Sequence, residues 1–400
     1  MIVNFPDEVR HIIDTLEKSG HEAYAAGGCI RDSLLGNIPQ DWDICTSALP
    51  EQTKQVFLGG HIIETGLKHG TVTLMLNCKP YEITTYRVDG KYKDNRRPET
   101  VRFVSVLKRD LARRDFTINA MAYNPKTGLV DYYGGRRDLA EKKIKCVGNA
   151  GKRFCEDALR IMRALRFASV FGFSIEPDTA AAMHKNKKLL HNISPERISA
   201  EFDKLILGGG VKRILSDHAG IIGEIIPEIR DLPDYVLSGV KNAPKDPAIR
   251  LAALLRVNPD TAENILSGLK YDRDTIKKVS QLILYRNFEI TSRPDIKRLL
   301  GKIGGERFRE LIELKKAESL ALGDEITGLD EIQKTADEII GQKQCFSLRD
   351  LALKGEDLIL AGMPKGPKIG AALNLLLDMV IDETAENDKK VLLDKIFVDK

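Results

Sequence analysis

The chain has 400 residues, of which 42% are hydrophobic and 30% charged, a composition typical of a soluble globular protein with several domains. Its 62 basic and 58 acidic residues leave a net charge of only +4, so any nucleic-acid surface must come from local clusters of Lys and Arg. The sequence has no apolar run long enough for a membrane span, no secretion signal and no CxxC pair among its six cysteines, which predicts a cytoplasmic protein with reduced thiols.

The first 145 residues alternate between helix and strand signals. Apolar residues at helical spacing predict a helix over 6–19 that stops at Gly20. Short strand-like runs separated by glycine, proline and asparagine follow at 22–26, 40–45, 61–63, 71–77 and 80–87. A helix over 110–123 and a strand near 129–133 complete the pattern. We therefore expect an α/β domain in this part of the chain.

Helical periods dominate from residue 146 onward, and β-branched alternation nearly vanishes. Breaks near 208–210 and 240–248 divide this helical region, and a last unit begins near 291. The predicted domains are therefore 1–145, 146–210, 211–290 and 291–400. No histidine follows His218, so the C-terminal part holds no histidine-based metal or acid–base site.

Two aspartates close in sequence give the first chemical signal. In the segment QDWDI, Asp41 and Asp43 would share one face of a strand, where like charges about 7 Å apart repel unless a cation bridges them. Carboxylate oxygens favour Mg²⁺, and a pair of Mg²⁺ ions is the usual clamp for nucleotidyl displacement. Solvated aspartates on an exposed strand are the alternative interpretation.

A glycine pair precedes the aspartates. A strand that enters Gly27-Gly28 and then a helix exposes backbone N–H groups to which phosphates can bind. Arg31, one turn into that helix, can bind a phosphate through two parallel N–H groups. Such a turn also occurs without any ligand, but together with the aspartates it indicates a nucleoside triphosphate and a metal.

Five motifs in order, GGCIRDSLLG, DWDI, RRDFTINAMA, DYYGGRRDL and EDALRIMRALRF, resemble class II tRNA nucleotidyltransferases, the bacterial CCA-adding enzymes. Related bacterial poly(A) polymerases share much of this set. The resemblance is dense over 20–210 and weaker beyond. It implies an α/β head with the DNA polymerase beta-like nucleotidyltransferase fold (mixed sheet plus helices), followed by all-α neck, body and tail domains at the limits given above.

The resemblance also assigns expected roles. It implies that Asp41 and Asp43 are catalytic and bind Mg²⁺, and that Gly28 and Arg31 contact the nucleotide. Glu82 lies on a strand that could sit beside the aspartates, either as a third carboxylate or in a structural role.

The motif RRDFTIN carries Arg114, Asp115 and Asn119. We expect Asp115 and Asn119 to lie one helical turn apart on one face. By resemblance they read the ribose hydroxyls with Arg114 close to the nucleotide, and a carboxylate is a good acceptor for a 2′-hydroxyl. A salt-bridged helix start is the alternative.

The segment EDALRIMRALR, which we expect to be helical, places Asp157, Arg160, Arg163 and Arg166 at intervals of three residues. Its three arginines form a row suited to a triphosphate or an RNA end. A solvated row in which Glu156 pairs with Arg160 is the alternative. By resemblance, Asp157 and Arg160 act as a protein template, since cytosine and adenine each present an amino donor beside a ring acceptor. Uracil and guanine reverse this order, at about 1–3 kcal/mol per unmet buried group.

Three further segments have counterparts in the family. The charged segment 89–98 matches a flexible loop linked to the ATP-specific state, with a plain surface loop as the alternative. Residues 131–135 resemble a hinge between head and neck, and 194–201 resembles a neck-stabilising helix.

The resulting prediction is an enzyme that adds CCA to the 3′ end of tRNA from CTP and ATP without a nucleic-acid template and releases pyrophosphate. An enzyme that adds only the final A, a poly(A) polymerase and a non-catalytic RNA-binding module are the alternatives. The missing histidines after His218 argue against an added phosphohydrolase activity. The oligomeric state and the residues that contact tRNA stay open.

Overall fold

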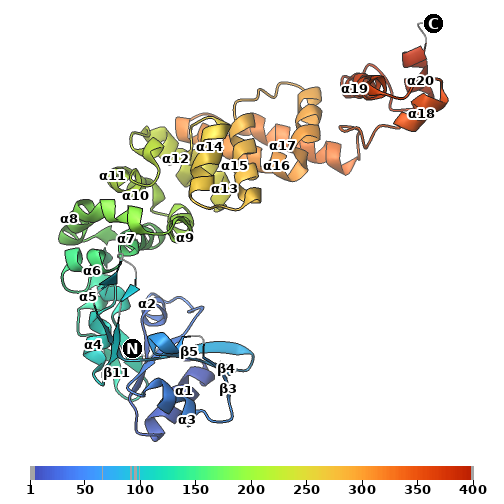
Figure 1. The fold of residues 1–400 in the computed structure, drawn as a ribbon. Helices are drawn as coiled ribbons and strands as arrows, with labels where there is room; N and C mark the ends of the chain where they lie inside the picture. Colours follow the sequence, from blue (N-terminus) through green and yellow to red (C-terminus); the bar gives the residue numbers. More distant parts are fainter. Residues whose placement is uncertain (1–4, 65, 91, 94–96, 99, 398–400) are drawn as a thin grey trace. The chain divides into compact units, whose positions relative to one another are not determined.

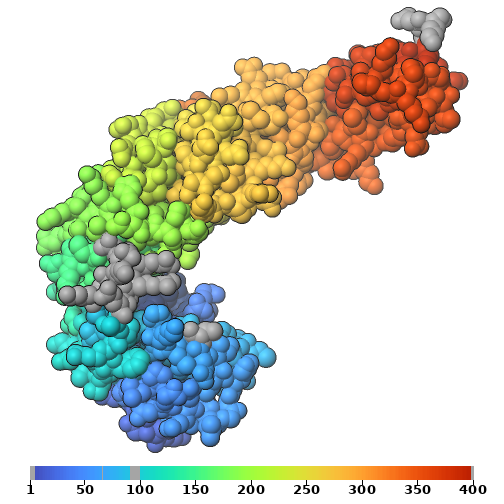
Figure 2. Space-filling view, viewed as in Figure 1, coloured from blue at the N-terminus to red at the C-terminus, as the bar shows by residue number. Residues whose placement is uncertain are grey.

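The computed structural model describes residues 5–64, 66–90, 92–93, 97–98 and 100–397. The chain divides into two compact units, residues 1–230 and 231–400 (Figure 1). In Figure 2 the first unit runs from blue to green and the second from green-yellow to red. None of the helices in the described ranges combines the length and the apolar character needed to cross a bilayer. The limits of the four predicted domains stay predictions.

A mixed sheet forms the centre of the head. Its strand order is β11-β10-β1-β2-β5-β4-β3, and only the β2–β5 pair among its neighbours is parallel. The strands are β1 Ala23–Ala26, β2 Asp43–Thr46, β3 His61–Ile63, β4 Thr71–Leu76, β5 Lys79–Thr85, β10 Ala122–Asn124 and β11 Gly128–Val130. The remaining short strands are β6 Arg87–Asp89, β7 Tyr92–Lys93, β8 Arg97–Pro98, β9 Val101–Phe103, β12 Lys143–Ile144 and β13 Ser174–Ile175. The α/β head predicted from the sequence is confirmed.

The helices of the head are α1 Asp7–Lys18, α2 Gly28–Leu34, α3 Pro50–Val56, α4 Leu107–Ala112 and α5 Gly135–Ala140. Short 3₁₀ turns η1 Leu67–His69 and η2 Thr117–Asn119 accompany them. The predicted helix over 6–19 is confirmed by α1, whose Val9, Ile12, Ile13 and Leu16 are fully buried. This apolar face explains why the periodic signal was sufficient.

The predicted helix over 110–123 is wrong. Helix α4 ends at Ala112, Phe116 has an extended backbone, and the chain then enters η2 and β10. The amide of Thr117 donates to the carbonyl of Lys145 at 2.9 Å, and Phe116 forms a β-bridge with Cys146. Pairing with a distant segment therefore overrides the local helical preference.

The strand predicted at 40–45 begins only at Asp43. Ile44 pairs with Ala25 on β1 and Asp43 with Glu82 on β5, whereas Trp42 packs against Phe5 with ring centroids 5.0 Å apart. Asp41 therefore precedes the strand, and the expectation that both aspartates lie within one strand is wrong.

Apart from the short strands β12 and β13, the regular elements in the rest of the first unit are helices. Its helices are α6 Ala150–Glu156, α7 Leu159–Phe171, α8 Pro177–Asn186, α9 Pro195–Ile206, α10 Val211–Asp217 and α11 Ala219–Ile222, with 3₁₀ turns η3 Lys187–Asn192 and η4 Pro227–Ile229. Helix α7 packs along α9, and the hydroxyl of Ser169 donates to the carbonyl of Leu205 at 2.7 Å.

The second unit is helical throughout its described residues. It contains α12 Asp234–Asn242, α13 Pro247–Leu254, α14 Pro259–Gly268, α15 Arg273–Tyr285, α16 Arg293–Leu322, α17 Thr327–Gly341, α18 Gly355–Leu360, α19 Pro367–Ile381 and α20 Lys389–Phe397. Helix α16 is interrupted at Gly304, whose φ of 77° is non-helical. A separate apolar cluster that includes Leu353, Leu376 and Leu392 forms the core of the C-terminal segment. The predicted helical remainder is confirmed.

The close packing of α7 on α9 yields a stability prediction. A Cβ atom at Gly208 would lie 2.6 Å from the carbonyl oxygen of Ser169, whereas one at the adjacent Gly209 would meet open space. We expect Gly208→Ala to lower the free energy of unfolding by about 1–3 kcal/mol because α7 and α9 must separate. Gly209→Ala should change it by less than about 0.5 kcal/mol. Denaturant unfolding of both variants measures the difference, and equal values would contradict the packing described.

Candidate active site

Two neighbouring strands carry the carboxylates. Asp43 begins β2 and lies directly opposite Glu82 on the parallel strand β5, while Asp41 lies two residues earlier. Loss of solvent raises the pKa of Asp43, which Arg114 opposes and Asp41 reinforces. Loss of solvent, then Asp43 and Asp41, raise the pKa of Glu82. Carboxylates that disfavour one another's charge in this way are suited to a bound cation.

Helix α2 begins at the glycine turn. Gly27 has a φ of 95°, and a Cβ atom there would overlap the guanidinium of Arg114. That guanidinium reaches the carbonyl of Asn119 at 3.4 Å and the carboxylate of Asp110 at 3.8 Å. A glycine is therefore needed at position 27 for both the backbone conformation and the close approach of Arg114.

Asp115 is the centre of a buried network. Its carboxylate accepts hydrogen bonds from Arg163 at 2.6 and 2.8 Å, from Asn119 at 3.0 Å and from the amide of Phe116 at 2.8 Å. Arg31 donates to the side-chain oxygen of Asn119 at 2.6 Å. The expected proximity of Asp115 and Asn119 is therefore present, although a 3₁₀ turn and not an α-helix produces it.

The segment predicted as one helix from Glu156 to Arg166 is interrupted. Helix α6 ends at Glu156, Asp157 has an extended backbone, and α7 begins at Leu159. Asp157 accepts hydrogen bonds from the amide of Leu159 at 3.1 Å and from Arg197 at 3.3 Å. The row expected on one helix is therefore broken at Asp157, whose carboxylate is bound to the start of α7 and to α9.

Arg160 is buried and held by several acceptors. It donates to Glu156 at 2.9 Å, to the carbonyl of Arg153 at 3.2 Å and to the carbonyl of Arg113 at 2.9 Å. The Glu156–Arg160 pair that the sequence offered as an alternative is therefore formed. A guanidinium has five N–H groups, so two of those of Arg160 have no acceptor among the residues that the structure describes and can meet a further one.

One cavity of about 840 Å³ brings all the predicted site residues together. Its lining includes Gly28, Arg31, Asp41, Asp43, Arg114, Asp115, Asn119, Asp157, Arg160, Arg163 and Arg166, and also Glu82. Their individual roles stay predictions. The shared cavity makes them one site and not a set of scattered motifs.

Sequence reasoning did not single out Asp110 or Arg113 for the site, although both line this cavity. Asp110 is only 1% exposed and accepts from the guanidinium of Arg113 at 3.0 Å and from the amide of Arg87 at 3.2 Å. An aspartate one turn before two arginines on a predicted helix is the signal that could have found this pair.

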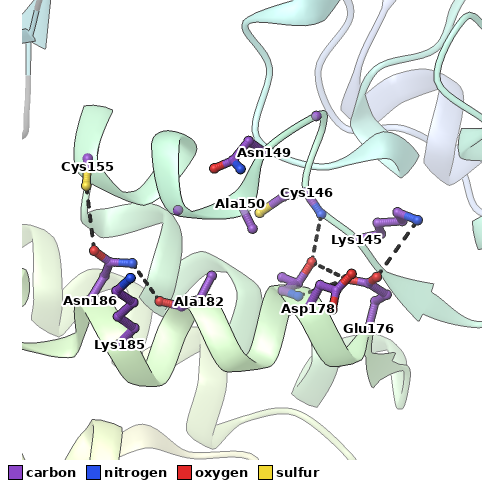
Figure 3. A pocket seen from close by; sticks show the side chains of 13 residues that line it. Lys145, Cys146, Asn149, Ala150, Cys155, Glu176, Asp178, Ala182, Lys185 and Asn186 are labelled. Atoms are coloured by element: carbon purple, nitrogen blue, oxygen red, sulfur yellow. Dashed lines mark hydrogen bonds and ion pairs between the residues drawn. The ribbon is translucent and has the colours of Figure 1, made fainter.

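A second cavity of about 680 Å³ lies between α6 and α8 (Figure 3). Its lining contains none of the predicted site residues. Several of its polar groups satisfy one another, since Thr179 accepts from the amide of Cys146 at 3.2 Å and donates to Glu176 at 2.7 Å. We assign no chemistry to this cavity.

The donor set at β2 suits a hard divalent cation. Asp41 and Asp43 offer carboxylate oxygens with exposed surface, which Mg²⁺ prefers. Within the described ranges no group of three His, Cys, Asp or Glu side chains is arranged to hold a metal ion. Two carboxylates are nevertheless the usual protein contribution where substrate phosphates and water complete the coordination.

Comparison with known proteins identifies the class. The Poly A polymerase head domain family matches residues 23–145, an RNA- and SrmB-binding region of polymerase A matches 172–232, and tRNA nucleotidyltransferase domain 2 matches 248–396. With the mixed sheet and the paired aspartates, these matches define a nucleotidyltransferase with the polymerase beta-like fold.

The family follows from full-length relatives. A CCA-adding enzyme of Limosilactobacillus fermentum is 37% identical, with 97% of this chain and 95% of that protein covered. A Bacillus stearothermophilus CCA-adding enzyme solved in complex with CTP is 30% identical with a TM-score of 0.79, and 98% of each chain is covered. The chain belongs to the family of CCA-adding enzymes.

A more distant structure shares the fold. The Thermotoga maritima CCA-adding enzyme, solved in complex with tRNA_CCA, has a TM-score of 0.68 at 21% identity, with 100% of this chain and 97% of that chain covered. The predicted family and fold class are confirmed by these matches.

The network around Asp115 predicts a pH-dependent contribution to stability. Burial alone would raise the pKa of this carboxyl, but Arg163 and the hydrogen bonds from Asn119, Arg163 and Phe116 outweigh burial and lower the pKa from 3.8 to about 2. A lowered pKa stabilises the fold above pH 4, and that stabilisation is lost as the pH falls from about 4 toward 2.

We expect Asp115→Asn to cost about 2 kcal/mol of unfolding free energy at pH 7, the equivalent of this pKa difference. Denaturant unfolding between pH 7 and pH 3 should show the gap from wild type narrowing below pH 4. Asp178→Asn, which changes an exposed aspartate on α8, is the matched control. A gap for Asp115→Asn that stays constant down to pH 3 would contradict the ion-pair assignment.

Proposed function

We propose that this chain adds CCA to the 3′ end of tRNA, using CTP and ATP without a nucleic-acid template and releasing pyrophosphate. The observation that carries the proposal is the single cavity shared by Asp41, Asp43, Asp157 and Arg160. It joins the groups suited to nucleotidyl transfer to the groups suited to reading a base. The CTP and tRNA complexes of the relatives support the substrates proposed.

The proposed roles of the site residues follow from their charges. Asp41 and Asp43 would hold Mg²⁺ at the edge of the sheet, where bound metal would stabilise the attacking 3′ oxygen and the leaving pyrophosphate. Arg31 and the backbone at Gly28 would orient the triphosphate, with Arg114 beside them. Asp115 and Asn119 would accept hydrogen bonds from the ribose hydroxyls, since both carboxylate and amide oxygens accept from a hydroxyl.

Asp157 and Arg160 would select the base. The carboxylate of Asp157 has two hydrogen bonds and room for more, so it can accept from the amino group of cytosine or adenine. The free N–H groups of Arg160 can donate to the adjacent ring nitrogen. Uracil and guanine would place acceptor against acceptor and donor against donor, which is expected to reject UTP and GTP by about two to four orders of magnitude.

The alternatives predict different products from the same cavity. An A-adding enzyme or a poly(A) polymerase would use ATP and leave CTP unused, and a non-catalytic module would bind RNA without transfer. The segment 89–98, on which the sequence argument for ATP use depends, lies partly outside the described residues. We also propose Mg²⁺ as the metal and the cytoplasm as the compartment.

Incubation of purified chain and Mg²⁺ with tRNA lacking its end, in the presence of all four ribonucleotides with one labelled at a time, tests the proposal. We expect the product to lengthen by C, C and A. Asp43→Asn should lower the rate by about three orders of magnitude or more because a metal-binding carboxylate is lost, while retained tRNA binding shows that the variant is folded. Long A tracts, A alone, or use of UTP equal to CTP would refute CCA addition.

Replacing the base-reading pair tests selectivity. We expect the double variant Asp157→Asn, Arg160→Gln to lose at least tenfold of the CTP-over-UTP ratio of kcat/KM, because the donor and acceptor that meet cytosine are changed. Arg153→Gln is the control, since Arg153 also pairs with Glu156 at 2.8 Å but does not line the cavity. An unchanged ratio in the double variant would remove Asp157 and Arg160 from base selection.

A further inference from the structure

The ring of Phe167, in the wall of the active-site cavity, contacts three guanidinium groups. The guanidinium carbons of Arg166, Arg31 and Arg163 lie 4.1, 5.1 and 5.4 Å from the ring centroid of Phe167. All are within the range of about 6 Å over which an aromatic ring attracts a cation. Arg31 comes from α2 and the other two from α7, so this ring joins elements that are far apart in the sequence.

The ring itself is held on several sides. Phe167 is 5% exposed, stacks on Phe171 with centroids 5.7 Å apart, and meets the edge of Phe116 at 5.8 Å. Phe171 also lies 4.9 Å from the guanidinium of Arg31. An aromatic side chain fixed by neighbours on helix and loop gives the guanidiniums a rigid surface.

Carboxylates hold the guanidinium edges while the ring meets their faces. Arg31 pairs with Asp32 at 2.8 Å, and Arg166 pairs with Glu201 at 3.1 Å. Only the Nη1 atom of Arg166 makes a hydrogen bond within the described part of the chain, to Glu201. The Nε and Nη2 atoms of Arg166 are therefore available to an anion in the cavity that Arg166 lines.

We infer that Phe167 is a positioning residue, which holds Arg31, Arg163 and Arg166 in one arrangement for the anionic nucleotide. The inference rests on the proposed function for the identity of the nucleotide. Like charges this close repel, so without the ring the three guanidiniums would depend on their polar partners alone and would lose orientational order, which adds an ordering cost to each binding event. Phe167 acts on nucleotide affinity through its neighbours and does not touch the reacting atoms.

The test compares substitutions at Phe167 with one at Phe173. Phe167→Leu keeps an apolar side chain but removes the aromatic face, and Phe167→Tyr keeps that face. Phe173→Leu is the matched control, because Phe173 is 4% exposed, belongs to the same aromatic cluster, and has no guanidinium over its ring within the described residues. Arg213 donates to the backbone carbonyl of Phe173 at 2.6 Å, a contact that the substitution leaves in place. All variants are made in the full chain, and the unfolding midpoint of each is measured.

We expect Phe167→Leu to raise KM for both CTP and ATP about tenfold, with kcat within about threefold of wild type. Phe167→Tyr should restore KM to within about threefold, and Phe173→Leu should lower the unfolding midpoint without raising KM. A fall in kcat alone, or an equal rise in KM in Phe173→Leu, would show that the ring only supports the fold and would overturn the inference.

Equilibrium dialysis with labelled CTP in the absence of tRNA separates this inference from the proposed function. We expect the Kd of Phe167→Leu to be about tenfold above wild type. Unchanged CTP binding in that variant overturns the role of Phe167 even if wild type adds CCA. Conversely, wild type that binds CTP but extends no tRNA refutes the proposed function. In that case the Kd values for CTP alone still decide the role of Phe167. If Phe167→Leu does not fold, Phe167→Met replaces it in the same measurements.

Discussion

The buried ion pair between Asp115 and Arg163 is the constraint on which the site depends. Asp115 lies in the loop before η2, and Arg163 on α7, so their contact at 2.6 Å fixes the sheet-bearing part of the first unit against α7. The same carboxylate accepts a hydrogen bond from Asn119, and Asn119 in turn accepts one from Arg31 on α2. The ion pair therefore also helps to fix the position of α2. Removing either partner would leave an uncompensated buried charge. The candidate binding residues in this network therefore depend on one another.

The sequence was most informative where a signal is local. The apolar period of α1 and the alternation of the sheet strands predicted those elements, and the ordered motifs predicted the family. The errors fall where a distant partner decides the local backbone. Phe116 and Thr117 pair with the segment before α6, which no helical propensity of 110–123 could anticipate. Asp157 likewise has an extended backbone at the end of α6, where its carboxylate accepts a hydrogen bond from Arg197 on α9.

In the site, too, local features could be predicted from the sequence and long-range contacts could not. The types of residue it needs, carboxylates for a metal and guanidiniums for phosphates, were readable from the motifs. The contacts among them were not, because they join positions far apart in the chain. Asp110 was missed although its contacts with Arg113 and Arg114 are local, because its burial is not visible in the motif. The role of Phe167, in contrast, becomes visible only when Arg31 is seen to lie beside it. The approach of Arg31 on α2 to Phe167 on α7, and not composition, creates the cation cluster.

The separation of charge within the cavity is what makes one site able to take both a metal and a triphosphate. Asp41, Asp43 and Glu82 lie at β2 and β5, whereas Arg163 and Arg166 lie on α7 with carboxylate partners of their own. If the arginines paired directly with the strand carboxylates, their charges would neutralise one another. The carboxylates would then bind a cation less tightly, and the arginines would bind a phosphate less tightly. Supplying the arginines with separate partners, Asp32, Asp115 and Glu201, leaves the strand carboxylates repelling one another and therefore open to a divalent ion.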